Sequence, residues 1–198
     1  MTKILPLAFV FLWSSAFITT LPIVLNSDPF SALAFRFFFV AICFLIFVIY
    51  KKINLKITFK NLINCFSTGV LFHGFYLGGV FYAIFVGLPT GLVALIVTMQ
   101  PILTNLMARY FLNEDISIKQ WIGVSLGFLG AVMVIGFDIG NQIPLKGFIA
   151  TIIALIAITS STIWQKKISK NVPLALNNMY QALGAVIFHL IIITFFFD

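Results

Sequence analysis

Long apolar runs alternate with short polar breaks along the whole chain. A helix needs about 20 apolar residues to cross roughly 30 Å of hydrocarbon, and each run is near that length. The pattern predicts an all-α fold, a polytopic membrane helix bundle. We expect its helices at Leu5–Leu25, Phe30–Tyr50, Leu62–Val86, Thr90–Phe111, Gln120–Phe137, Gly147–Trp164 and Leu174–Phe197. The breaks leave no room for a soluble domain, so any function lies within the membrane.

The sixth apolar run resembles the first. Trp13-Ser14-Ser15 stands in the middle of the first run, and Thr159-Ser160-Ser161 stands at a comparable depth in the sixth. Each of the two runs is followed by a break with a proline and then by another apolar run. We therefore predict one complete five-helix repeat over residues 1–140 and the first two helices of a second, inverted repeat over residues 141–198. Inverted repeats of this kind are typical of secondary transporters.

Composition and charge support a membrane protein of defined orientation. Hydrophobic residues make up 62% of the chain and charged residues 9%, whereas soluble domains are about 45–50% apolar and about 25% charged. If the N-terminus is cytoplasmic, the other side carries only Lys146, and the positive-inside rule is satisfied. The cytoplasmic side then carries Lys3, Lys51, Lys52, Lys56, Lys60, Arg109, Lys119, Lys166, Lys167 and Lys170. We read the net charge of +7 as a signal of topology in a lipid bilayer, with no nucleic acid as partner.

Several kinds of chemistry lack their motifs. The sequence contains no Cys-x-x-Cys, His-x-x-His or His-Glu-x-x-His pattern and no Gly-rich phosphate loop. The apolar runs hold His73 and His189 on different predicted helices and no acidic residue, so no nucleophile–base pair converges there. We therefore expect no metal site, no cofactor and no enzyme activity. Transport would have to be driven by an ion gradient, by exchange or by the gradient of the substrate.

Glycine and proline positions suggest how the helices pack. Gly74 and Gly78, like Gly123 and Gly127, stand four residues apart, a spacing that lets membrane helices approach closely. Pro101 lies in the middle of the fourth predicted helix, where it should bend the helix and free a backbone carbonyl. Its neighbours Thr98 and Gln100 would suit the wall of a cavity.

Polar groups inside the membrane are the first candidates for a site. Arg36 stands about two turns into the second predicted helix, where it could extend outward, pair with Asp28 or attract an anion. Trp13 and Ser14 fall in the middle of the first. A serine there could hold helices together by hydrogen bonds or could bind a substrate.

Aromatic and histidine side chains add further candidates. Tyr76, Tyr82 and Trp164 could stack on a flat or cationic substrate, although a tryptophan at a helix end also serves as an interfacial anchor. His73 could carry a proton, or it could be a neutral ring packed in the protein.

Five separate stretches, in the right order, resemble EamA-type members of the drug/metabolite transporter superfamily. They are Leu12 to Phe17, Phe35-Arg36-Phe37, Thr98-Met99-Gln100-Pro101, Leu112-Asn113-Glu114 and Gln120-Trp121-Ile122-Gly123. The resemblance implies two inverted five-helix repeats with a substrate cavity between them, walled partly by the first, third, fourth and sixth helices. It implies a secondary transporter in a bacterial inner or plasma membrane, moving a small metabolite or drug-like molecule such as an amino acid or amine. The substrate-binding candidates are then Trp13, Ser14, Arg36, His73, Tyr76, Tyr82, Gln100 and Trp164.

The chain departs from this family in the number of its helices. Seven are predicted, whereas family members usually have ten. We expect either a piece of a longer transporter or a truncated, non-transporting membrane remnant. A third alternative is a chain that pairs with a second chain or with the missing C-terminal helices.

Overall fold

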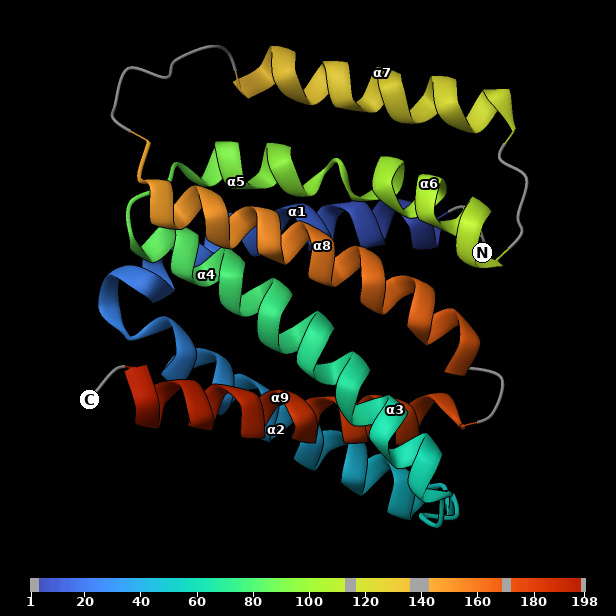
Figure 1. The fold of residues 1–198 in the computed structure, drawn as a ribbon. Coiled ribbons are helices and arrows are strands. Elements are labelled where there is room, and N and C mark those ends of the chain that lie inside the picture. Colours follow the sequence, from blue (N-terminus) through green and yellow to red (C-terminus); the bar gives the residue numbers. More distant parts are fainter. Residues whose placement is uncertain (1–3, 113–116, 136–142, 169–171, 197–198) are drawn as a thin grey trace.

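The computed structural model describes residues 4–112, 117–135, 143–168 and 172–196, and all the regular elements there are helices (Figure 1). The predicted all-α membrane bundle is confirmed. Its elements are α1 (Ile4–Asn26), α2 (Pro29–Tyr50), α3 (Phe59–Gly69), the π-helix η1 (Val70–Tyr76), α4 (Leu77–Phe85), α5 (Thr90–Val97), α6 (Gln100–Leu112), α7 (Ile118–Ile135), α8 (Leu145–Ile168) and α9 (Leu174–Phe196).

Five segments within the described residues are long and apolar enough to cross a membrane. They are Pro29–Tyr50, Phe59–Phe85, Thr90–Met107, Leu145–Ile168 and Leu174–Phe195. The third predicted helix is thus the continuous span α3–η1–α4, and the fourth is the interrupted span α5–α6. In α1 the described apolar part is the shorter segment Val10–Asn26.

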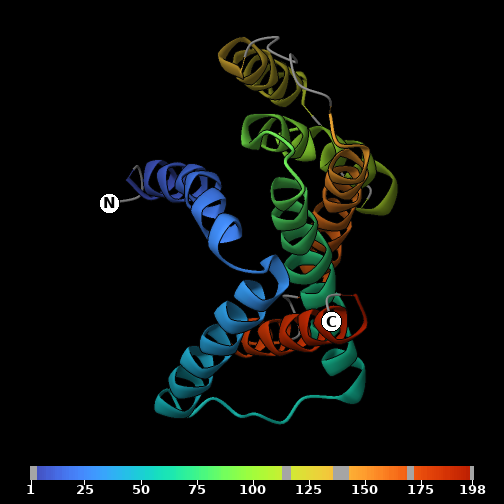
Figure 2. The same cartoon turned by 90° about the vertical axis from the view of Figure 1, so that its left-hand side faces the viewer.

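The centre of the bundle is the span α3–η1–α4. Its α3 end packs on α9, and its α4 end packs on α8, while α2 lies along α9 in the most extensive helix pair (Figures 1 and 2). Helix α1 packs against α4 and α5. Helix α7 contacts α5 and α6 and lies at the edge farthest from α2 and α9. Where these helices meet, their buried side chains form an apolar core that includes Leu33, Phe37, Phe81 and Ile158.

The sequence predicts a bend at Pro101, and the structure shows a break in the helix just before it. Helix α5 ends at Val97 and α6 begins at Gln100, so that Pro101 is the second residue of a new helix. A proline in a first helical turn lacks an N–H that would have had no intrahelical partner anyway. The break leaves Thr98 between the two helices, and its hydroxyl donates to the carbonyl of Leu95 at 2.6 Å.

Glycines permit three close backbone contacts between helices. An added Cβ would overlap the backbone of Gln181 at Gly69, and it would lie 2.8 Å from the carbonyl oxygen of Ala150 at Gly79. At Gly184 it would lie 2.9 Å from the carbonyl oxygen of Phe66. Such contacts give membrane helices their packing energy, because lipid is as apolar as the helix surfaces.

The glycine pairs expected from the sequence behave differently. Gly74 and Gly78 are in contact with the rings of Phe188 and Phe30 rather than with a helix backbone. A Cβ added at Gly123 or Gly127 would meet none of the described atoms within 4 Å. The expected close packing at Gly123 and Gly127 is therefore wrong, because α7 contacts its neighbours through other parts of its surface.

We predict opposite effects of alanine at two of these glycines. Gly69→Ala should lower the free energy of unfolding by about 1–3 kcal/mol, the usual cost of overpacking, because the new methyl group meets backbone that cannot move aside. Gly123→Ala, which meets open space, should leave stability unchanged or raise it, since alanine is the better helix former. Thermal unfolding of both purified variants in detergent tests this. Equal stability of the two would contradict the assigned α3–α9 contact.

Candidate functional site

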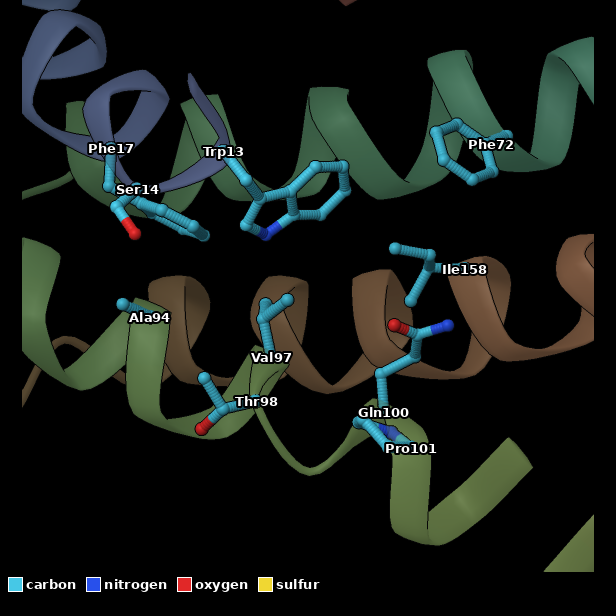
Figure 3. A pocket seen from close by; sticks show the side chains of 10 residues that line it. All are labelled: Trp13, Ser14, Phe17, Phe72, Ala94, Val97, Thr98, Gln100, Pro101 and Ile158. Atoms are coloured by element: carbon cyan, nitrogen blue, oxygen red, sulfur yellow. The ribbon is translucent and has the colours of Figure 1, made fainter. Parts of the chain in front are cut away.

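A cavity of about 630 Å³ lies between α1, η1, the α5–α6 span and α8 (Figure 3). Its lining residues come from near the middle of their spans, so the cavity lies at mid-membrane depth. They are Trp13, Ser14, Phe17, Phe72, Ala94, Val97, Thr98, Gln100, Pro101 and Ile158.

The polar part of the wall depends on the break between α5 and α6. Gln100 opens α6, and its amide extends towards Ile158 of α8, while Trp13 and Ser14 border the cavity from α1 (Figure 3). The Gln100 side-chain amide Nε2 donates to the hydroxyl of Thr162 at 3.3 Å. That hydroxyl donates in turn to the carbonyl of Ile158 at 2.7 Å. The bond from Gln100 fixes one end of the amide to α8.

An aromatic pair stands where α1 borders the cavity. The rings of Trp13 and Tyr76 are stacked, with centroids 6.4 Å apart and planes inclined by 8°. Tyr76 is buried, and its ring also meets the edge of Phe72 at 5.6 Å. Trp13 is 36% exposed and borders the cavity, so its indole offers a flat apolar surface to an occupant.

Arg36 lies behind this pair. It lines a small second cavity, of about 40 Å³, together with Trp13, Thr20 and Tyr76. The guanidinium carbon lies 5.7 Å from the centre of the Phe37 ring. The ion pair considered between Arg36 and Asp28 is not formed. Instead, the Asp28 carboxylate accepts from the backbone N–H of Ser31 at 2.6 Å and caps the N-terminus of α2.

Three further predicted site residues, like Arg36 and Tyr76, are not part of the lining of the main cavity. The His73 ring packs against Phe37 at 4.6 Å. Tyr82 borders a separate apolar cavity of about 200 Å³, with its ring 6.2 Å from that of Phe30. Trp164 lines a third cavity, of about 280 Å³, at the lysine-bearing end of α8 together with Ser160 and Lys167. The structure thus brings together Trp13, Ser14, Tyr76 and Gln100 and leaves the other four around them.

Sequence reasoning missed the apolar lining. Phe17 and Phe72 border the cavity, as does Ile158. A spacing of four residues places two side chains on the same face of a helix. Phe17 has this spacing from Trp13, Phe72 from Tyr76, and Ile158 from Thr162, the hydrogen-bond partner of Gln100. That spacing was the available signal, but a membrane helix is apolar on every side. Among the described residues, no group of three or more His, Cys, Asp or Glu side chains could hold a metal ion.

Comparison with known proteins identifies the family. The model of the EamA-like transporter family matches residues 2–136. A probable amino-acid metabolite efflux pump of Escherichia coli (strain K12) is 27% identical over 166 residues, which are 83% of this chain and 53% of that protein. A Salmonella typhimurium protein of the same description is 26% identical over 170 residues, 85% of this chain and 54% of its own length.

A third relative has less overlap. The uncharacterized transporter YvbV of Bacillus subtilis is 28% identical over 122 residues, 61% of this chain and 38% of its own length. The chain spans about half the length of the first two relatives. Since the family model covers more than half of the chain, the protein belongs to the EamA-like transporter family of the drug/metabolite transporter superfamily.

Proposed function

We propose that this chain contributes to a secondary transporter in which a small metabolite crosses the membrane through the cavity bordered by Trp13, Ser14 and Gln100. The observation that carries the proposal is the cavity itself, which lies at mid-membrane depth beside a broken helix. Its volume of about 630 Å³ falls within the roughly 300–1,000 Å³ of small-molecule sites. Irregular backbone is tolerated at this depth where it is buried in protein or lines a cavity.

The lining suits a molecule with an apolar or aromatic body and a few polar groups. Phe17, Phe72 and Val97 provide apolar contacts, and the Trp13 indole provides a stacking surface. The Gln100 amide and the Ser14 and Thr98 hydroxyls provide hydrogen-bonding groups. An amino acid, an amine or a drug-like compound fits this set. The names of the Escherichia coli and Salmonella relatives favour an amino-acid metabolite and an outward direction.

Contacts between the two predicted repeats support a site between inverted halves. Ile158 of α8 lines the cavity that α1 borders, and Gln100 is bonded to Thr162. Helices α1 and α8, and likewise α2 and α9, run in opposite directions across the bundle (Figure 1). We propose that these are equivalent helices of residues 1–140 and 141–198. In an arrangement of this kind, α8 and α9 would meet further helices, supplied by the same or a second chain.

We infer a cytoplasmic N-terminus and a bacterial inner or plasma membrane. The lysine-rich break between α2 and α3, including Lys51, Lys52 and Lys56, lies at the same end of the bundle as Lys166 and Lys167 of α8 (Figure 1). Positive charge gathered at one end supports the orientation that the positive-inside rule assigns.

The cavity should be accessible to water, which cysteine labelling can test. In a protein whose Cys43 and Cys65 are replaced by alanine, Thr98→Cys should react with a membrane-impermeant maleimide, because a thiolate forms in water but not in hydrocarbon. The matched control is Ile156→Cys on the outward side of α8, which is 52% exposed and borders none of the cavities described above. Labelling should be at least tenfold slower there. Equal rates at the two positions would contradict an aqueous cavity.

The three tryptophans form a matched set for a flux assay. Stacking on an aromatic ring contributes about 0.5–1.5 kcal/mol, so Trp13→Ala should reduce flux roughly 2- to 10-fold. Trp164→Ala should also reduce flux, because Trp164 borders the cavity of about 280 Å³ at the lysine-bearing end of α8, where it can stack on a passing substrate. Trp121→Ala on α7 is the control and should have no effect. The assay uses proteoliposomes of the full-length protein and a panel of labelled amino acids and amines. If the protein is reconstituted but transports none of these compounds, the transport proposal is overturned and the non-transporting membrane remnant remains.

Arg36 borders the small cavity that shares Trp13 and Phe17 with the main one, so it should distinguish substrates that bear a carboxylate. A charged hydrogen bond contributes about 1.5–3 kcal/mol, so Arg36→Gln should raise the KM for such a substrate by roughly tenfold or more. Arg36→Lys should restore part of the affinity. The matching amine without its carboxylate should be transported equally well by all three proteins. A KM that does not change on Arg36→Gln would remove Arg36 from the site.

A further inference from the structure

The hydrogen bonding of η1 departs from that of an α-helix at one identifiable carbonyl. In an α-helix the amide N–H of Leu77 would donate to the carbonyl of His73, four residues earlier. Here the Leu77 N–H donates to the carbonyl of Gly74. The His73 carbonyl oxygen instead lies 3.1 Å from Nε2 of His189, which belongs to α9. A carbonyl only accepts, so His189 must carry its proton on Nε2 and donate it to this oxygen.

The His189 ring is held firmly enough to act as a fixed donor. Its side chain has no exposed surface. The rings of Phe30 and Phe37 lie 5.9 and 6.1 Å away, and that of its neighbour Phe188 lies at 5.4 Å. An added Cβ at Gly78 would lie 3.4 Å from the imidazole, so the ring packs directly on the backbone of α4.

The wide turn of η1 determines which aromatic side chains lie at the cavity wall. Both Phe72, which lines the cavity, and Tyr76, which stacks on Trp13, belong to η1. A π turn takes more residues than an α turn, so η1 rotates the helix before it relative to the helix after it. With this rotation, Gly69 of α3 meets Gln181 on α9, while Gly79 of α4 meets Ala150 on α8.

We propose that His189 is a positioning residue for the cavity. By donating its Nε2–H to the His73 carbonyl, it holds η1 in the wide form that places Tyr76 against Trp13 and Phe72 in the cavity wall. Helix α9 contributes none of the residues that line the main cavity in the described part of the chain. His189 therefore acts through the backbone of η1. Substrate binding by this cavity wall rests on the proposed function. The effect of His189 on the shape of η1 does not.

Replacing His189 by glutamine or by asparagine tests whether the position of the N–H donor matters, because both side chains are polar amides but place the nitrogen differently. The side-chain nitrogen of glutamine can take the place of Nε2, whereas that of asparagine can take only the place of Nδ1. In the full-length protein, His189→Gln should therefore keep the wide turn and His189→Asn should lose it. Without the donor, the His73 carbonyl is left unpaired in an apolar environment, so η1 opens more readily, and Phe72 and Tyr76 move relative to Trp13.

Hydrogen exchange followed by mass spectrometry reads the turn directly. Amides of residues 70–78 should exchange at least tenfold faster in His189→Asn than in the unmodified protein, with His189→Gln close to the unmodified rate. Residues 90–97 of α5 are the internal control and should exchange alike in all three. Equal exchange of residues 70–78 in the two variants would overturn the proposal.

Fluorescence provides a second readout at the cavity wall. With Trp121→Phe and Trp164→Phe in the background, Trp13 is the only tryptophan and reports its stacking on Tyr76. Acrylamide quenching should increase about twofold with His189→Asn and stay unchanged with His189→Gln. Unchanged quenching in His189→Asn would also overturn the proposal. Neither readout requires flux, so a failure of the transport proposal would be recognised separately.

Discussion

The fold depends on one constraint: within hydrocarbon, each backbone N–H and C=O must find its partner inside the protein. Most of the chain meets this by continuous helix. Within the described residues, the backbone departs from α-helical geometry at membrane depth at two places, in η1 and at the junction of α5 and α6. Both departures border the same cavity. In the first, the imidazole of His189 donates to a backbone carbonyl, and in the second the hydroxyl of Thr98 does so.

The same two departures explain why the cavity has polar groups at all. An uninterrupted fourth span would continue through Thr98 and Gln100 as ordinary helix. The break lets Gln100 begin a new helix, extend towards α8 and bond to Thr162 there. On the facing side, η1 contributes Phe72 to the cavity wall and stacks Tyr76 on Trp13, so an aromatic wall faces the Gln100 amide. The glycine contacts at Gly69 and Gly79 hold the central span in this orientation.

Hydrophobic length and proline position made the helices predictable. The helix predicted at Phe30–Tyr50 is observed at Pro29–Tyr50, and a bend near Pro101 was expected from the chemistry of proline, although the structure shows a break between two helices. The π turn was not predicted, because its defining bond joins residues 73 and 189 and leaves no mark on local sequence. The pairing of Arg36 with Asp28 was a wrong alternative, since the aspartate caps a helix from a position that favours this role. Polar candidates such as Ser14 and Gln100 could be picked out in an apolar chain, whereas Phe17 could not.

The resemblance between the first and sixth apolar runs extends to the cavities. When Trp13-Ser14-Ser15 is aligned with Thr159-Ser160-Ser161, Ser14 corresponds to Ser160 and Phe17 to Ile163. Ser14 and Phe17 line the main cavity, and Ser160 and Ile163 line the smaller cavity beside Trp164. Helix α6 borders both, through Gln100 at its start and Met107 two turns later. Two helices that run in opposite directions and use equivalent faces to border cavities are what an inverted repeat would produce. This correspondence supports the proposed equivalence of α1 and α8. It also supports a place for Trp164 in the proposed pathway, although Trp164 is far from Trp13 along the chain.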